Sequence, residues 1–124
     1  MRILLDTQLV LWALSGHSRL PREARRLIDR SEVFVSAASI WEVAIKSSLG
    51  KLDADPIAVN EALAPSGFEE LAVSGEHAAY VAQLPPHHRD PFDRLLVAQS
   101  VLEALVIVTT DTQLEPYGGL VRIV

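Results

Sequence analysis

Hydrophobic residues along the chain fall into short runs, separated by longer segments with a different spacing. The runs lie at Ile3–Leu5, Val33–Val35, Leu105–Val108 and Leu120–Val124. Short apolar runs without alternation are typical of strands that are covered on both faces, as the strands of parallel sheets are. We therefore predict four buried strands.

The segments between these runs carry hydrophobic side chains three and four residues apart, which is the period of one helix face. The predicted helices are Thr7–Leu14, Pro21–Arg30, Ser39–Leu49, Pro56–Ala64, Gly75–Leu84 and Pro91–Leu105. Alternation of strands and helices predicts an α/β fold with a mostly parallel sheet. The length of 124 residues fits one domain, so we expect residues 1–124 to form a single unit.

The composition limits the chemistry that is available. The chain has no cysteine, which excludes disulfides, thiolate zinc sites and cysteine nucleophiles. No apolar run approaches the roughly 20 residues of a membrane span, and Asp6 interrupts the first one, so we expect no signal peptide, no membrane contact and a cytoplasmic protein. The formal net charge is −5, and a nucleic-acid substrate would therefore need local cations.

Four acidic residues stand where an α/β fold brings chain segments together. Asp6 and Asp111 follow predicted strands, and ligands of open α/β sheets bind beyond the carboxyl ends of the strands. Asp93 and Glu42 lie in the first turns of predicted helices and can project toward the same crevice. Carboxylates in one crevice repel each other unless a cation is present. Oxygen ligands favour Mg²⁺ or Mn²⁺, ions that promote phosphodiester cleavage.

Each acid also has a purely structural interpretation, which the residues alone leave open. Asp6 and Asp111 are suited to cap the helical turns that follow them. The stretch Asp90–Asp93 has the pattern of a capped helix start, with a proline at the first helical position. Glu42 is four residues from Lys46 and is suited to pair with it on a helix surface.

Four segments carry a family resemblance, in the order LLDTQLVLW (4–12), SAASIWEVAIK (36–46), HHRDPFDRLLVAQS (87–100) and IVTTDTQLEPYG (107–118). They span nearly the whole chain, and the third is long and specific. With these segments the sequence resembles the PIN-domain family, specifically the VapC-type toxins of toxin–antitoxin systems. The resemblance implies a three-layer α/β/α fold and an Mg²⁺- or Mn²⁺-dependent endoribonuclease. It also implies a homodimer that a cognate VapB-type antitoxin inhibits by reaching into the acidic cleft.

The resemblance assigns roles to individual residues. The implied catalytic and metal-binding acids are Asp6, Glu42, Asp93 and Asp111. Asp90 lies in the same motif and is expected to cap the helix or to support the acids. Apart from the resemblance, the hydroxyl of Thr109 or Thr110 is suited to hydrogen bond to a carboxylate or to metal-bound water, and equally to the backbone at the end of the strand. Arg94 is expected to pair with an acid or to bind an RNA phosphate. Gln8 departs from the pattern, since many close relatives have histidine at this position.

Other residues receive weaker predictions. The four histidines, His17, His77, His87 and His88, show no zinc-site spacing, and we expect the adjacent pair to lie in a loop. A basic run of Arg22, Arg25, Arg26 and Arg30 is either a solvated helix face or part of an RNA path. Trp12 and Trp41 lie on apolar faces and are expected in core or dimer packing.

Three other classes of protein are alternatives to a nuclease. A PIN module that only binds RNA or a partner is the main alternative, and the loss of an acid would favour it, but all four acids are present. A signalling receiver domain needs a pair of acids beside the first strand and a lysine after the last. A haloacid-type phosphatase needs a second acid two residues after the first, where this chain has Gln8.

Overall fold

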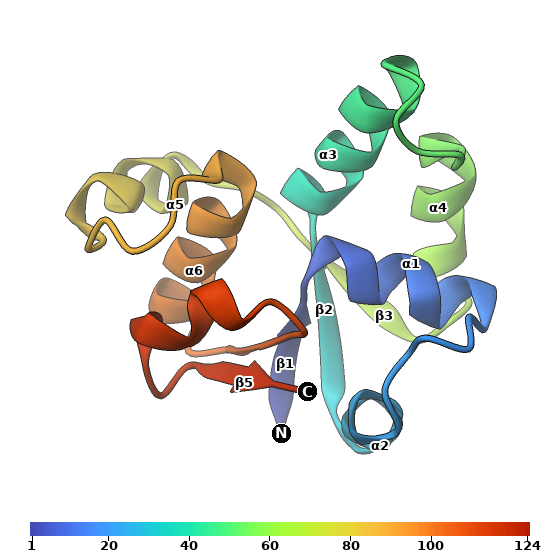
Figure 1. Ribbon diagram of the computed structural model, residues 1–124, viewed down its shortest axis with the longest axis horizontal. Helices are drawn as coiled ribbons and strands as arrows, with labels where there is room; N and C mark the ends of the chain where they lie inside the picture. The colour runs from blue at the N-terminus through green and yellow to red at the C-terminus, as the bar shows by residue number, and fades with distance from the viewer.

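The computed structural model describes all residues from Met1 to Val124 and contains one five-stranded sheet (Figure 1). The strands are β1 (Arg2–Leu5), β2 (Glu32–Ser36), β3 (Phe68–Leu71), β4 (Val106–Thr109) and β5 (Val121–Ile123), in the spatial order β3-β2-β1-β4-β5. All four neighbouring pairs are parallel. The predicted α/β class is confirmed, and the carboxyl ends of all five strands meet at one edge of the sheet.

The helices connect these strands in the predicted order. They are α1 (Thr7–Ser15), α2 (Arg22–Arg30), α3 (Ala37–Ser48), α4 (Pro56–Leu63), α5 (Gly75–Tyr80) and α6 (Pro91–Glu103), with 3₁₀ turns η1 (Val81–Gln83) and η2 (Thr112–Tyr117). The predicted helix Gly75–Leu84 is divided into α5 and η1. Pro21 precedes α2 as its cap instead of occupying its first turn. None of these helices has the length and apolar character required to span a membrane.

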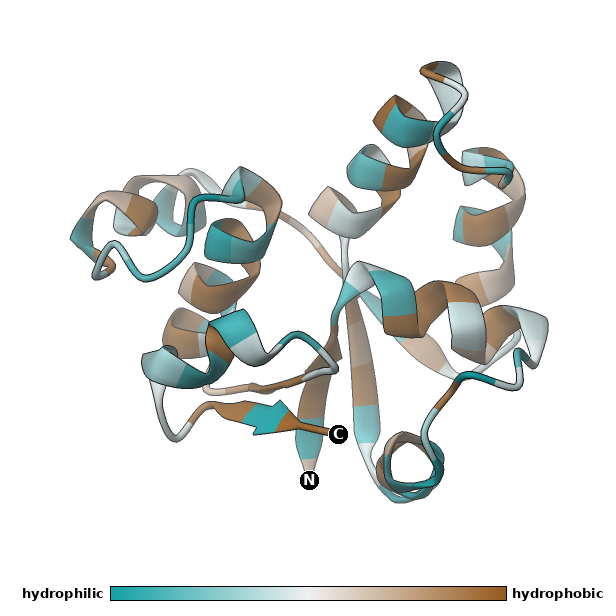
Figure 2. Ribbon diagram, viewed as in Figure 1, coloured by the Kyte–Doolittle hydropathy of each residue, from teal (hydrophilic) through white to brown (hydrophobic).

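The sheet is packed on both faces, which confirms the predicted three layers. Ile3 and Leu5 lie in one hydrophobic cluster with residues of α1, α2 and α4. Leu4, between them, lies in a second cluster with residues of α6 and η2. Figure 2 shows the hydrophobic central strands between these helix layers. All three side chains are fully buried, and each contributes roughly 1.5–3 kcal/mol through removal from water.

Strand β3 was not predicted, and its sequence explains why. It reads FEEL, and of its residues only Phe68 is buried, whereas Glu69 and Glu70 are exposed. The strand lies at the edge of the sheet and pairs only with β2, with Phe68 opposite Val33. Exposed charges are common on edge strands because they discourage pairing with another chain. No apolar run therefore marks this strand.

Candidate active site

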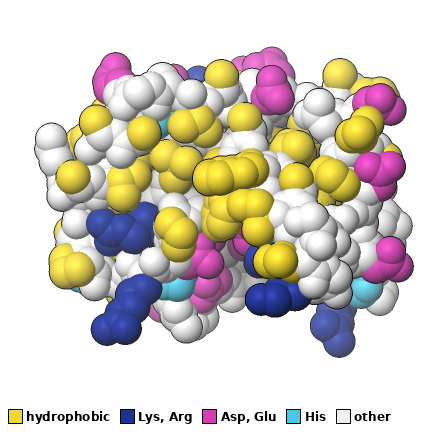
Figure 3. Space-filling view, turned by 90° about the horizontal axis from the view of Figure 1, so that it is seen from above, with side chains coloured by type: hydrophobic (Ala, Val, Ile, Leu, Met, Phe, Trp, Pro, Cys, Tyr) yellow, Lys and Arg dark blue, Asp and Glu magenta, His cyan; other side chains and the backbone are white.

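An acidic cleft opens at the carboxyl edge of the sheet. Its cavity of about 230 Å³ is lined by acidic residues and a few polar neighbours, namely Asp6, Glu42, Asp90, Asp93, Asp111, Thr7, Gln8, Lys46 and Thr110, with three hydrophobic residues. Figure 3 looks onto this end of the molecule and shows acidic side chains beside a histidine in a hollow. The four predicted acids come from distant parts of the sequence and line one cavity.

Asp6 is both a helix cap and a wall of the acidic cleft. It follows β1, is only 8% exposed, and accepts a 2.8 Å hydrogen bond from the Leu9 amide through Oδ1. Its Oδ2 accepts a hydrogen bond from the Thr109 hydroxyl, as predicted for this threonine. Burial raises the pKa of Asp6 above its usual value, and the charges of Glu42 and Asp111 raise it further. The hydrogen bonds from Thr109 and Leu9 act in the opposite direction.

Glu42 is buried on α3 with both carboxylate oxygens already bonded. Its Oε1 accepts a 2.7 Å hydrogen bond from the Thr7 hydroxyl, and its Oε2 accepts one of 2.7 Å from Lys46 Nζ. The predicted pair of Glu42 and Lys46 is confirmed. The hydrogen bond to Glu42 is the main reason that the pKa of Lys46 is raised. With both oxygens occupied, Glu42 is better placed for an indirect contact with an ion than for a direct one.

Asp90 and Asp93 divide two tasks at the start of α6. Asp90 caps the helix, since its Oδ1 accepts hydrogen bonds from the amides of Phe92 (2.9 Å) and Asp93 (3.1 Å). Pro91 occupies the first turn, as predicted. The side chain of Asp93 is thereby left for the cleft. Burial raises the pKa of Asp93 to about 6, aided by the charges of Asp90 and Glu42 and opposed by a hydrogen bond with His88.

Asp111 lies on the opposite wall, two residues beyond β4. It caps η2 through a 2.9 Å hydrogen bond from the Gln113 amide, and its own amide donates to Thr109 Oγ1 at 3.0 Å. Its side chain is 38% exposed. Thr109 therefore connects Asp6 to Asp111, whereas Thr110 lines the cleft with no hydrogen bond from its side chain. The capping role predicted for Asp6, Asp90 and Asp111 is confirmed, and the same residues line the acidic cleft.

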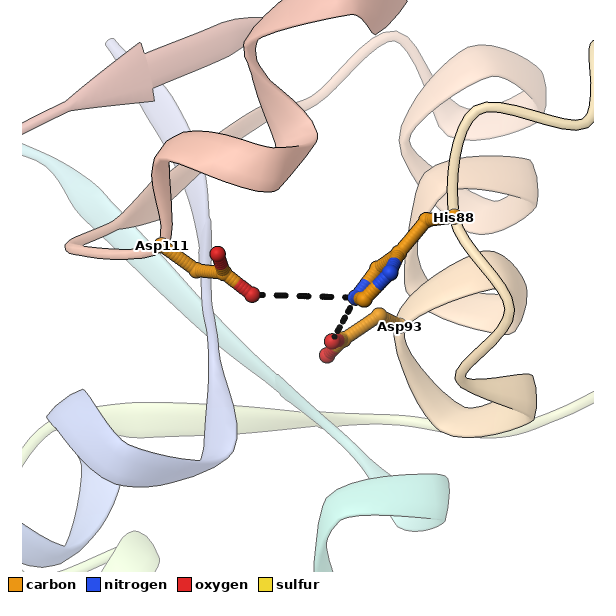
Figure 4. A group of neighbouring side chains, drawn as sticks. All are labelled: His88, Asp93 and Asp111. Atoms are coloured by element: carbon orange, nitrogen blue, oxygen red, sulfur yellow. Dashed lines mark hydrogen bonds and ion pairs between the residues drawn. The ribbon is translucent and has the colours of Figure 1, made fainter.

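His88 is a site residue that the sequence reasoning missed. Its Nε2 lies 2.8 Å from Asp93 Oδ2 and 3.6 Å from Asp111 Oδ2, and its side chain is only 12% exposed. Figure 4 shows the ring directed at both carboxylates. The neighbouring His87 is exposed and packs edge-on against Tyr117. The only feature of the sequence that could have indicated a role for His88 is its position, two residues before Asp90, the N-cap of α6.

Arg94 does not pair with an acid, contrary to expectation. Its guanidinium donates hydrogen bonds to the carbonyl oxygens of Val81 (3.0 Å), Pro85 (3.1 Å) and His88 (3.4 Å). A further hydrogen bond of 3.3 Å reaches the Tyr117 hydroxyl. Arg94 thus ties the segment between α5 and α6 to the first turn of α6. Its contribution to the site is to fix the loop that carries His88.

Sequence comparison identifies the family to which this arrangement belongs. A model of the PIN domain matches residues 3–120. The chain belongs to the PIN-domain family. No curated protein matches the sequence of this PIN domain. The family assignment therefore rests on a match that covers nearly all of the chain and all four acids of the cleft.

The solved structures that are similar to this PIN domain include a toxin–antitoxin complex. VapBC2 from Rickettsia felis, bound to a DNA fragment from its promoter, is 15% identical over 100% of this chain and 98% of the other, with a TM-score of 0.70. A toxin–antitoxin complex from Klebsiella pneumoniae is 19% identical over 97% and 95%, with a TM-score of 0.68. FitAcB from Neisseria gonorrhoeae is 19% identical over 96% and 95%, with a TM-score of 0.64. At these identities, the likeness shows a shared fold.

The donors in the cleft of this PIN domain fit a divalent cation. Asp6, Asp93 and Asp111 present carboxylate oxygens, and carboxylates are the ligands that Mg²⁺ and Mn²⁺ prefer. The one lysine of the cleft, Lys46, is hydrogen bonded to Glu42, and His88 is the basic side chain beside Asp93 and Asp111. Carboxylate oxygens from three separate segments thus line a cavity with an excess of negative charge.

The arginines of α2 do not border this cleft. The helix lies at the opposite end of the PIN domain from the carboxyl ends of the strands (Figure 1). Arg22, Arg25 and Arg26 line a separate hollow, and Arg25 lies 3.8 Å from Asp29 on the same helix. The interpretation of this basic run as a solvated helix face is therefore favoured over a role in the RNA path.

Proposed function

We propose that this PIN domain is a metal-dependent endoribonuclease whose catalytic acids are Asp6, Glu42, Asp93 and Asp111. The observation that carries the proposal is their convergence on one cavity from four separate segments. Burial raises the pKa of both Asp6 and Asp93, so that keeping them ionised costs free energy in the absence of a cation. Retention of all four acids favours the enzyme over a PIN module that only binds.

The residues of the cleft divide the work as follows. Asp6, Asp93 and Asp111 hold Mg²⁺ or Mn²⁺, and Glu42 acts indirectly because Thr7 and Lys46 occupy its oxygens. When bound, the ion activates water and neutralises charge on the phosphate and on the leaving oxygen. Thr109 orients Asp6 through its hydroxyl, and Asp90 sets the first turn of α6 that presents Asp93.

RNA cleavage by the purified protein tests this function. The chelator-treated protein is expected to leave a structured RNA intact, and addition of Mn²⁺ or Mg²⁺ is expected to restore cleavage, because the clustered acids cannot act without a cation. Products are resolved by denaturing gel electrophoresis over time. Full cleavage in excess chelator would contradict the metal mechanism, and no cleavage with either ion would favour the binding-only PIN module.

We further propose that the protein is the toxin component of a toxin–antitoxin pair and acts in the cytoplasm on RNA. Its fold is shared with VapBC2 from Rickettsia felis, with a toxin–antitoxin complex from Klebsiella pneumoniae and with FitAcB from Neisseria gonorrhoeae. An antitoxin of the VapB type would inhibit it by placing a cationic side chain against Asp6, Asp93 or Asp111. The open, acidic character of the cleft supports such an interaction.

We also propose that the protein forms a homodimer, because Trp41 and Phe92 form an exposed aromatic surface. Trp41 on α3 is 60% exposed and packs edge-on against Phe92 of α6, with ring centroids 5.2 Å apart. Both residues line an apolar hollow with Val81 and Leu95. A tryptophan this exposed is typical of an interface, because it is a large apolar surface left in water. The core packing expected for Trp41 is wrong, and dimer packing remains the prediction.

Substitution of Trp41 tests the homodimer. Trp41→Glu is expected to convert the dimer to a monomer with an unchanged circular dichroism spectrum, because a charge at a packed interface is costly to bury. Multi-angle light scattering after size exclusion measures the mass. Ile57→Glu, at another exposed apolar position, is the matched control and should leave the mass unchanged. A wild-type monomer, or a variant dimer of unchanged affinity, would reject this interface.

A further inference from the structure

A nitrogen donor lies among the carboxylates at one side of the acidic cleft. The atoms His88 Nε2, one oxygen of Asp93 and one of Asp111 all lie within 4.8 Å of one another. None of the other three histidines of the chain lies in this cluster. We call His88, Asp93 and Asp111 the His88 triad. Asp6 and Glu42 line the cleft but are not members of the triad.

The distances from His88 Nε2 to Asp93 and to Asp111 are close to those between adjacent ligands of one ion. Ligands about 2.1 Å from an octahedral ion are about 3.0 Å apart at adjacent positions. His88 Nε2 lies 2.8 Å from Asp93 Oδ2 and 3.6 Å from Asp111 Oδ2. Figure 4 shows that the ring presents this nitrogen to both carboxylates, from the loop before α6 and across from η2. Small adjustments of the side chains would place all three donors around one cation.

The loop that carries His88 is held in place by its backbone. Arg94 donates hydrogen bonds to the carbonyl oxygens of Pro85 and His88, and the Tyr117 hydroxyl donates to Pro85 at 3.0 Å. The ring is consequently positioned by α6 and η2, the elements that also carry Asp93 and Asp111. Donors held by the same elements form a preorganised site, because little order is lost when an ion binds.

We propose that the His88 triad is a mixed nitrogen and oxygen site that binds a divalent transition ion through His88 Nε2. The proposal rests on the proposed function, because it places this ion in the same acidic cleft. An imidazole nitrogen favours first-row transition ions, whereas Mg²⁺ prefers oxygen ligands alone. The triad therefore makes the cleft selective for ions such as Mn²⁺ over Mg²⁺.

Pulsed electron paramagnetic resonance of bound Mn²⁺ tests the proposal without reference to activity. Mn²⁺ added to the wild-type protein is expected to show nitrogen coupling, and protein grown with ¹⁵N-histidine is expected to change the coupling from the ¹⁴N to the ¹⁵N pattern. This arm needs no variant that might fail to fold. Bound Mn²⁺ without histidine coupling would overturn the proposal and leave the nuclease function standing. Absence of bound Mn²⁺ would also overturn the proposal, and RNA cleavage with Mg²⁺ would then decide whether the nuclease function stands.

Two variants then separate a ligand from a positioning residue. His88→Gln keeps a side-chain amide that is able to hydrogen bond to Asp93, and it is expected to abolish the coupling and to weaken Mn²⁺ binding about tenfold or more. Mg²⁺ binding should change less than about threefold, because Mg²⁺ does not depend on the nitrogen. Titration calorimetry measures both affinities. His87→Gln, at the adjacent exposed histidine, is the control and should retain the coupling and both affinities.

The change in Mn²⁺ affinity relative to Mg²⁺ affinity decides between the two roles of His88. Equal weakening of Mn²⁺ and Mg²⁺ binding in His88→Gln, together with absence of coupling in the wild-type protein, would show that His88 only positions Asp93 and would overturn the proposal. Loss of Mn²⁺ preference with retained Mg²⁺ binding would support it.

Discussion

Asp6→Asn is expected to reduce RNA cleavage by at least about 100-fold while the protein stays folded. Substitution of residues that merely orient metal ligands already costs 10–100-fold, and Asp6 is proposed to be a ligand itself. Asparagine is as good a helix cap as aspartate, so the hydrogen bond from Leu9 is retained. The other position of the carboxylate, which accepts from the Thr109 hydroxyl, becomes the amide nitrogen, and this nitrogen can donate to Thr109 Oγ1 once that hydroxyl turns away. The substitution thus removes a charge and preserves the local structure.

Initial rates of RNA cleavage at saturating Mn²⁺ measure this effect. Asp29→Asn makes the same chemical change at an exposed position on α2, away from the cleft, and should cleave at the wild-type rate. Circular dichroism should show that both variants are folded. Wild-type cleavage by Asp6→Asn would remove Asp6 from the catalytic site and with it the expected set of ligands.

Asp93→Asn is expected to stabilise the metal-free protein at pH 7.5. The pKa of Asp93 is raised from 3.8 to about 6, so the folded state holds this proton more tightly than the unfolded state does. Between these two pH values the unfolded chain loses the proton first, and the free energy of unfolding falls as the pH rises. Above pH 6 the full cost of ionised Asp93 is present. Asparagine removes that cost, which is on the order of 1–3 kcal/mol.

Thermal unfolding in chelator measures the difference. At pH 7.5 the midpoint of Asp93→Asn should lie roughly 3–10 °C above that of the wild type, and the gap should shrink toward zero near pH 4, where Asp93 is protonated in the folded wild type. Added Mn²⁺ should raise the wild-type midpoint more than that of the variant. A variant less stable than the wild type at pH 7.5 would show that ionised Asp93 does not destabilise the folded protein.

The features that were predicted from the sequence depend on interactions within a short stretch of chain or on general rules of parallel sheets. Ile3–Leu5 and Leu105–Val108 are apolar runs that can only be buried, and both coincide with central strands. Asp90 and Pro91 fix the start of α6 by capping and by proline geometry, which act within one turn. The convergence of Asp6 and Asp111 followed from a general property of parallel sheets, in which neighbouring strands end at the same edge.

The features that were missed depend on contacts between distant segments. Strand β3 forms by pairing with the free edge of β2. Because β3 contains Glu69 and Glu70, it shows no apolar run in the sequence. His88 faces the cleft, and His87 does not, because Arg94 and Tyr117 hold the backbone of their loop. The bonding partners of Arg94 are carbonyl oxygens, which carry no sequence signal. The exposure of Trp41 likewise could not be inferred from its apolar surroundings in the sequence.

A crystal of the protein grown with Mn²⁺ tests the central claim most directly, because Mn²⁺ is located by its anomalous scattering. The account predicts a peak in the acidic cleft, about 2.2 Å from carboxylate oxygens of at least two of Asp6, Asp93 and Asp111. A cleft without a peak at an Mn²⁺ concentration that supports full RNA cleavage would contradict it.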